Sequence, residues 1–163
     1  MEAAGLGDRA FVILAFVAAM GCGIVGGIFY AFSSFVMRAL GRLPAEQGAA
    51  AMKAINVAVI NPVFMLAFMG TALVCLALAG LSLPVLDGLA GKAALAGSLL
   101  YLFGCFGVTM VFNVPLNNAL ARAAPDREAP LWARYLKVWT AWNTVRTVAS
   151  SAAAALLVAA LMV

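Results

Sequence analysis

The stretch AFVILAFVAAMGCGIVGGIFYAFSSFVM, residues 10–37, decides the fold of this chain. It contains no charged side chain, and it is longer than the roughly 20 apolar residues that a helix needs to cross a bilayer. Every backbone N–H and C=O group in lipid must find a partner within its own segment, because no water is present to replace it. The stretch is therefore predicted to be a membrane-spanning helix.

Three further apolar runs follow, at about 57–80, 93–112 and 145–163, and only short linkers separate them. Short connections favour antiparallel neighbours in helical bundles. We therefore predict an all-α fold, an integral membrane antiparallel (up-down) four-helix bundle, formed by a single transmembrane domain over residues 1–163. Its helices are expected at about 10–38, 50–80, 92–121 and 131–163.

Composition excludes several classes of protein. Hydrophobic residues make up 66% of the chain and charged residues 10%, whereas soluble domains have about 45–50% apolar and roughly 25% charged residues. A soluble enzyme, a nucleic-acid-binding protein and a disordered tail do not fit these values. The lipid bilayer is the expected surrounding, and no nucleic acid is expected as a partner.

The basic residues are distributed unevenly between the two ends of the predicted bundle. Arg9 and Lys92 lie at one end, and the other eight lie at the opposite end: Arg38, Arg42, Lys53, Arg122, Arg127, Arg134, Lys137 and Arg146. Positively charged residues are retained on the cytoplasmic side of a membrane. We therefore expect an integral protein of the bacterial inner membrane with both termini on the non-cytoplasmic side.

Polar side chains gather at the same, cytoplasmic, end of all four predicted helices. An amide in lipid is costly unless it is hydrogen-bonded, so this convergence predicts a shared network and a binding pocket. The candidate substrate-binding residues are Tyr30, Ser33, Asn56, Asn61, Asn113, Asn117, Trp142, Asn143, Arg146 and Thr147. Pro62 and Pro115 lie beside the asparagines and are expected to make this end irregular.

Arg146 is the most informative of these residues, because an intramembrane charge usually faces the bundle interior or a wet cavity. The apolar runs contain no acid to neutralise it; the candidate carboxylates are Glu46, Asp126 and Glu128 in the linkers. The alternative interpretation is structural: the asparagines join helices, and Arg146 anchors the chain at lipid phosphates.

Other features have structural interpretations. Trp132, Tyr135 and Trp139 are expected to form an aromatic belt at the membrane interface. The stripe Phe64, Met65, Phe68 and Met69 is expected in the core or in the wall of a hydrophobic pocket. Gly23 and Gly27 form a GxxxG motif, and Gly97, Gly104 and Gly107 recur in the third run. We expect them to pack helices within the chain rather than to form a dimer face.

Metals and cofactors are not expected. The chain has no histidine, and its three cysteines lie singly in apolar runs, so the usual ligands of haem, copper and non-haem iron are missing. We predict no metal site and no cofactor.

Three stretches carry a resemblance to a known family: GGIFYAFSSFVMRALGRLPAEQGAAAMKAINVAVINPVFMLAFMGTA (26–72), NVPLNNALA (113–121) and WTAWNTVRTVASSAAAALL (139–157). In these stretches the chain resembles the anthrone oxygenase-like family of small membrane proteins, whose fungal members oxidise an anthrone to an anthraquinone. The family-motif positions are Asn56, Asn61, Asn113, Asn117, Trp142, Asn143, Arg146 and Thr147. The resemblance assigns a catalytic role to none of them.

The resemblance implies cofactor-independent oxidation of a lipophilic aromatic or polyketide-type substrate in a pocket at the cytoplasmic end. Phe29, Phe32, Phe64 and Phe68 are candidates for the apolar walls, and no general base is evident. The alternative is a non-catalytic membrane subunit or a lipid- or quinone-binding protein with a structural Asn/Arg network. Partners on either view are a lipophilic small molecule, a second copy of the chain or a larger membrane complex.

Overall fold

The computed structural model describes residues 6–163, without the side chains of Leu6, Pro125 and Asp126. Within this part of the chain every regular element is a helix, and no strand is present. Four helical stretches are long and apolar enough to cross a membrane: Gly7–Leu40, Pro62–Val85, Leu89–Ala121 and Arg127–Leu161. The all-α class and the four apolar spans predicted from the sequence are confirmed.

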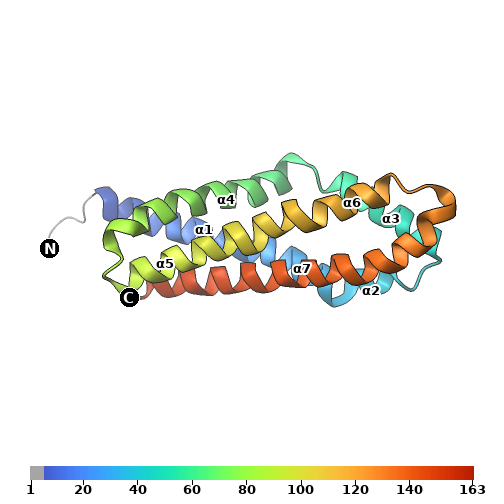
Figure 1. Ribbon diagram of the computed structural model, residues 1–163. Coiled ribbons are helices and arrows are strands. Elements are labelled where there is room, and N and C mark those ends of the chain that lie inside the picture. The colour runs from blue at the N-terminus through green and yellow to red at the C-terminus, as the bar shows by residue number, and fades with distance from the viewer. Residues whose placement is uncertain (1–5) are drawn as a thin grey trace.

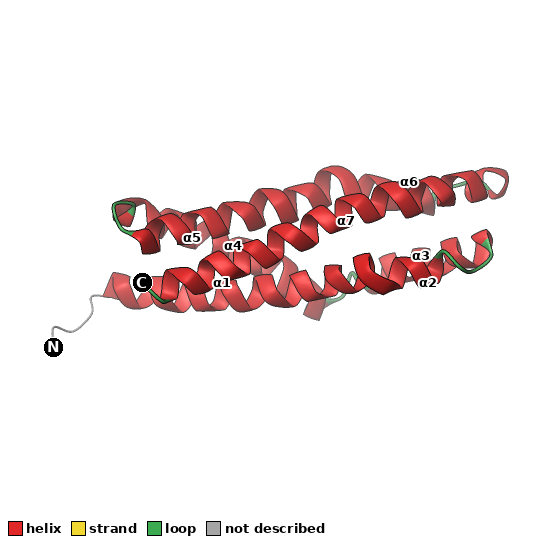
Figure 2. Ribbon diagram, turned by 90° about the horizontal axis from the view of Figure 1, so that it is seen from below, coloured by secondary structure: helices red, strands yellow, loops and turns green. Residues whose placement is uncertain are grey.

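The helices lie along one long axis. The first span comprises α1 (Leu6–Ala31), η1 (Phe32–Val36) and α2 (Met37–Leu40), and the short helix α3 (Ala45–Ala58) follows it. The second span comprises α4 (Pro62–Ser82) and η2 (Leu83–Val85). The third comprises α5 (Leu89–Leu99), η3 (Leu100–Gly107), η4 (Thr109–Asn113) and α6 (Val114–Ala121), and the fourth lies in α7 (Pro125–Leu161). Figure 1 shows α7 returning to the end of the molecule where α1 begins, and α2, α3 and α6 grouped at the other end. Figure 2 shows the same elongated arrangement from below.

The segment expected as one helix over about 50–80 is divided into α3 and α4, and this expectation was wrong. Asn61 has an extended backbone, with φ −123° and ψ 157°, directly before Pro62. Proline disfavours a helical conformation in the preceding residue, and it lacks the N–H group that would continue the hydrogen bonds of the helix. Asn61 then caps α4, because its Oδ1 accepts a hydrogen bond from the Phe64 N–H at 3.0 Å.

Two of the four spans contain wide π-helical turns: η1 in the first, η3 and η4 in the third. Such turns are rare and are found often at functional sites, because they shift the side chains that follow to a new face. η1 carries Ser33, and η4 carries Thr109 and Asn113. The turns therefore lie in the region where the sequence predicts the polar cluster.

Two apolar clusters stabilise the molecule. The larger joins α1, α4, α5, η3 and α7 and includes all three cysteines, which are free thiols. The smaller lies at the α3 end, where Trp132, Tyr135 and Trp139 stack in series with ring centroids 5.7 Å apart. These three rings are at most 4% exposed, so the expected interfacial belt was wrong: α3 covers them, together with Met37, Met52 and Leu120.

Glycines allow close helix packing at some of the predicted positions. A Cβ atom on Gly104 would lie 2.6 Å from the Cβ of Ala149 on α7, and one on Gly97 would lie 3.0 Å from Leu157 Cγ. Gly23 and Gly27, in contrast, would meet no atom within 4 Å. The prediction of packing against another helix is confirmed for Gly97 and Gly104. It was wrong for Gly107, where a Cβ atom would meet only the Leu102 backbone oxygen of the same span, and for the GxxxG motif of α1, which faces outward.

The substitution Gly104→Ala should therefore destabilise the protein, whereas Gly23→Ala should not. Alanine raises helix propensity by about 1 kcal/mol at either position, but at Gly104 overpacking against Ala149 is expected to cost about 1–3 kcal/mol. Thermal unfolding in detergent would show a lower midpoint for Gly104→Ala and an unchanged or higher one for Gly23→Ala. Equal midpoints would contradict the close contact between η3 and α7.

Candidate functional site

A buried arginine occupies the middle of the molecule. Arg146 on α7 is 4% exposed, and its guanidinium carbon lies 3.9 Å from the ring centroid of Phe29 and 5.2 Å from that of Trp139. Nη1 donates to Thr109 Oγ1 at 3.1 Å, and Nη2 donates to Asn143 Oδ1 at 2.7 Å. The cation is thus held by two neutral oxygens and by aromatic faces, which attract cations through their quadrupoles.

Asn143 connects this arginine to the first span. Its Nδ2 donates to the backbone oxygen of Phe29 and to Ser33 Oγ, both at 2.7 Å. Ser33 Oγ also lies 3.0 Å from Thr144 Oγ1. Asn143 is fully buried and uses both ends of its amide, so it joins α1, η1 and α7 while it orients the guanidinium.

The guanidinium has no negatively charged partner among the described side chains. Among the described residues, a salt bridge joins Lys53 Nζ to Glu128 Oε2 at 2.5 Å, at the α3 end of the molecule. Of the other acids considered from the sequence, Glu46 lies exposed in the first turn of α3, and the Asp126 side chain lies outside the described residues. Arg146 Nε is buried and has no hydrogen-bond partner.

A cavity of about 280 Å³ lies beside Arg146, at the junction between α3 and α4. Its wall is mostly aromatic and aliphatic. The lining residues are Ile28, Phe29, Phe32, Met52, Ile55, Asn56, Val59, Ile60, Phe64, Met65, Phe68, Met69, Phe106, Thr109, Met110, Val114, Asn117, Trp139 and Arg146. The four phenylalanines expected in apolar walls, Phe29, Phe32, Phe64 and Phe68, all line this cavity, and so do the residues of the Phe/Met stripe.

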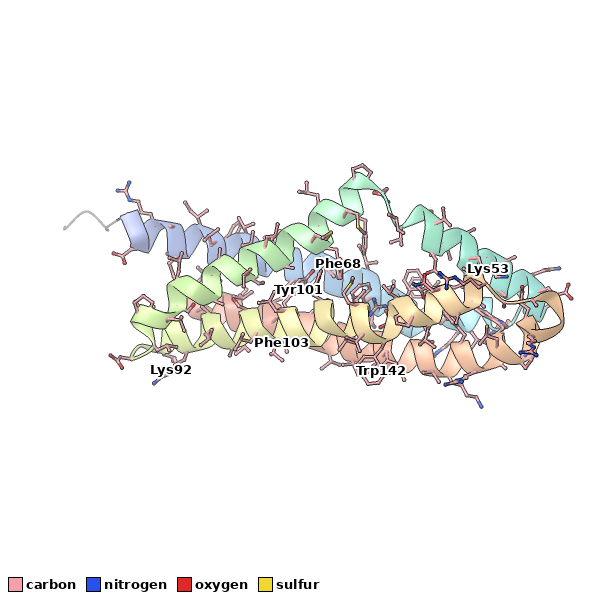
Figure 3. The ribbon with its side chains drawn as sticks, turned by 45° about the horizontal axis from the view of Figure 1, so that its top comes forward. Lys53, Phe68, Lys92, Tyr101, Phe103 and Trp142 are labelled. Carbon is pink, nitrogen blue, oxygen red and sulfur yellow. The ribbon has the colours of Figure 1, made fainter. Side chains whose placement is uncertain are left out.

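The rings of this wall form a stacked array. Phe68 lies 5.8 Å from Phe64 and 5.3 Å from Phe106, with interplanar angles of 7° and 25°. Phe29 meets Phe68 edge to face at 6.3 Å. Figure 3 shows Phe68 directed from α4 toward the interior of the bundle. Flat walls of this kind suit a flat apolar ligand.

Two amides, those of Asn56 and Asn117, also line the cavity. The Tyr135 hydroxyl donates to Asn117 Oδ1 at 2.6 Å. Asn113 is buried next to it, and its Nδ2 donates to the backbone oxygen of Trp139 at 3.2 Å. Of the predicted site residues, Asn56, Asn117 and Arg146 line this cavity.

Other predicted site residues lie away from the cavity. Tyr30 is 62% exposed; Asn61 is exposed and caps α4, its Nδ2 donating to Ala58 O. Trp142 stacks on Phe112 at 3.7 Å on the outer surface, where Figure 3 shows it directed away from the bundle. Thr147 bonds to the Asn143 carbonyl of its own helix, and Ser33 supports the site through Asn143.

Sequence reasoning missed Thr109 and Tyr135 as site residues. Thr109 Oγ1 accepts from Arg146 and donates to the Cys105 carbonyl at 2.8 Å. A single threonine in an apolar run usually bonds only to its own helix, so the sequence carries no signal for its second contact. Tyr135 was assigned to the interface, because the cover supplied by α3 is not evident from hydropathy.

Comparison with known protein families gives one assignment. The sequence model described as anthrone oxygenase matches residues 64–156, which is more than half of the chain and includes most of α4, the third span and Arg146. The chain therefore belongs to the anthrone oxygenase family. No match was found among curated proteins or among solved structures.

Replacement of Asn143 by alanine should lower stability, because it removes hydrogen bonds to Phe29, Ser33 and Arg146 together. Leaving buried polar partners unsatisfied costs about 1–3 kcal/mol and more for charged groups. The exposed Asn118 on α6 offers a matched control, Asn118→Ala, expected to change little. Chemical or thermal unfolding of both variants in detergent measures the difference, and equal stabilities would show that the Asn143 network contributes nothing.

Proposed function

We propose that the protein binds a lipophilic aromatic molecule in the cavity beside Arg146 and oxidises it with molecular oxygen, without a cofactor. The substrate class is that of anthrones and related polyketides. The single observation that supports this most is the pairing of a buried, uncompensated guanidinium with flat aromatic walls. Membership of the anthrone oxygenase family is consistent with it.

The chemistry balances with oxygen as the only co-reactant. Loss of a proton from the central ring carbon of an anthrone gives a carbanion whose charge is shared with the carbonyl oxygen. Its reaction with O₂ forms a carbon–oxygen bond and a peroxide anion, which takes up one proton to become the hydroperoxide; loss of water then gives the anthraquinone. Arg146, held by Thr109 and Asn143, would stabilise the negative oxygen in a site that excludes water.

The substrate would reach the cavity from the bilayer. Ile60, Met69 and Met110 line the cavity and are 72%, 50% and 51% exposed. They come from the α3–α4 break, α4 and η4, so the cavity wall continues into the apolar outer surface. A lipophilic molecule would therefore enter sideways without crossing water.

We further propose how the molecule sits in the membrane, as an up-down antiparallel bundle forming one domain. The second span has 24 residues, whereas the other three have 33–35, which corresponds to roughly 15 Å of extra helix at 1.5 Å per residue. α3, with the facing parts of α2, α6 and α7, would extend beyond the hydrocarbon on the cytoplasmic side of a bacterial inner membrane. The Lys53–Glu128 pair lies in this extension, and the cavity lies at its boundary with the lipid.

A second candidate function is binding without chemistry, as a quinone- or lipid-binding protein or as a subunit of a larger membrane complex. The observation that favours it is the lining of the cavity, which among the described residues contains no histidine or carboxylate to serve as a general base. The two functions differ in one measurable respect: only the first consumes oxygen when an anthrone is added.

The substitution Arg146→Gln should reduce oxygen consumption with an anthrone by 100-fold or more, because loss of a buried oxyanion-stabilising group costs about 10²–10³ in rate. The control Trp142→Phe changes a residue on the outer surface and should retain normal turnover. That result would show that a substitution on α7 does not by itself disturb insertion into the membrane. Oxygen uptake by purified protein in detergent measures both. If the wild-type protein turns over the anthrone and Arg146→Gln does so at the same rate, an active role for the guanidinium is refuted.

The proposed orientation predicts which sites a membrane-impermeant thiol reagent reaches. In a background with Cys22, Cys75 and Cys105 replaced by alanine, a cysteine at Gly88 should be labelled from the periplasm and one at Arg42 only after permeabilisation. Gly88 follows the second span and Arg42 follows the first. The reverse labelling pattern would place the termini in the cytoplasm.

A further inference from the structure

The charge of the cavity sets a requirement on its ligand. Arg146 is the only side chain with a formal charge among the described residues that line the cavity, and no lining residue is an acid. Burial of a cation without a partner is unfavourable in a medium of low dielectric constant. A ligand with a single negative charge would remove this imbalance, whereas a neutral ligand would leave it in place.

The guanidinium also retains hydrogen-bonding capacity. Of its five N–H donors, two are used, toward Thr109 and Asn143. Phe29 covers one face of the group at 3.9 Å, so the remaining donors point outward in the plane of the guanidinium. Nε has no hydrogen-bond partner, and Arg146 lines the cavity. An anionic oxygen of a ligand would use the free donors best, since it forms hydrogen bonds that are about twice as strong as those of a neutral oxygen.

The cavity lacks any side chain that readily accepts a proton. Its polar lining consists of amides, the Thr109 hydroxyl, the Trp139 indole and the guanidinium. None of these groups is a base near neutral pH. A ligand that arrives already ionised needs no base, whereas a neutral ligand has no side chain to which it can give its proton.

We propose that the site selects the ionised form of an acidic aromatic ligand: a flat enolate or phenolate of two or three rings with one negative charge, its oxygen bound by Arg146. This inference rests on the proposed function and specifies its substrate class. The cavity of about 280 Å³ lies at the lower limit of ligand pockets, roughly 300–1,000 Å³, which favours a compact ring system over a long-chain quinone.

A matched pair of probes separates charge from shape. 2-Hydroxy-1,4-naphthoquinone is an anion at neutral pH, and 2-methoxy-1,4-naphthoquinone has nearly the same outline without the charge. Calorimetric titration of the purified protein in detergent, with empty micelles as a blank, should show the anion bound about 10- to 100-fold more tightly, the range expected for hydrogen bonds to a charged group. Arg146→Gln should abolish this preference, while Arg134→Gln, an exposed arginine of the same helix, should keep it.

Each other outcome is decisive. Equal binding of both probes to the wild-type protein would overturn charge selection and leave the cavity as a neutral aromatic site. Binding of neither would overturn this inference and the proposed function together. A preference that survives in Arg146→Gln but disappears in Arg134→Gln would overturn the inference in favour of attraction by surface charge. The wild-type comparison does not depend on the folding of either variant.

Discussion

The structure depends on one constraint: a guanidinium must remain buried in a bundle where, among the described residues, no other charged side chain is buried. Arg146 is bound by Thr109 from the third span, by Asn143 from its own helix and by the ring of Phe29 from the first. Asn143 in turn binds the backbone of α1 and the side chain of Ser33. The same contacts that orient the cation thus fix the relative positions of three spans, and loss of one would weaken the others.

Irregular backbone creates the space beside this cation. Asn61 and Pro62 end one helix and begin another, and the cavity lies at that junction. The π-helical turns η1 and η4 bring Ser33, Thr109 and Asn113 to their positions. The aromatic residues of α7, covered by α3, close the α3 end of the cavity. The wall is therefore flat and apolar on most sides, and its polar groups include the Arg146 guanidinium and the amides of Asn56 and Asn117.

Hydropathy was sufficient to predict the four spans, and the intramembrane arginine was sufficient to indicate where the site lies. The asparagines were predicted as one group, and the structure divides them: Asn56 and Asn117 line the cavity, Asn61 caps a helix, and Asn113 and Asn143 join helices. Sequence patterns do not distinguish these roles, because each depends on which neighbour faces the amide. The burial of Trp132, Tyr135 and Trp139 was missed for a similar reason, since it requires the short helix α3 to fold back over them. The break before Pro62, in contrast, has a local signal in the sequence, the pair Asn61–Pro62. It was missed because the apolar run at about 57–80 continues across this pair.

The most direct test of the account is a measurement of distance between the guanidinium and a ligand. Solid-state nuclear magnetic resonance on protein with ¹⁵N-labelled arginine, reconstituted with ¹³C-labelled 2-hydroxy-1,4-naphthoquinone, would report dipolar coupling between guanidinium nitrogen and the labelled ring. The account predicts a contact in the wild-type protein that disappears in Arg146→Gln. A ligand without coupling to any arginine, or a coupling that persists in Arg146→Gln, would contradict it.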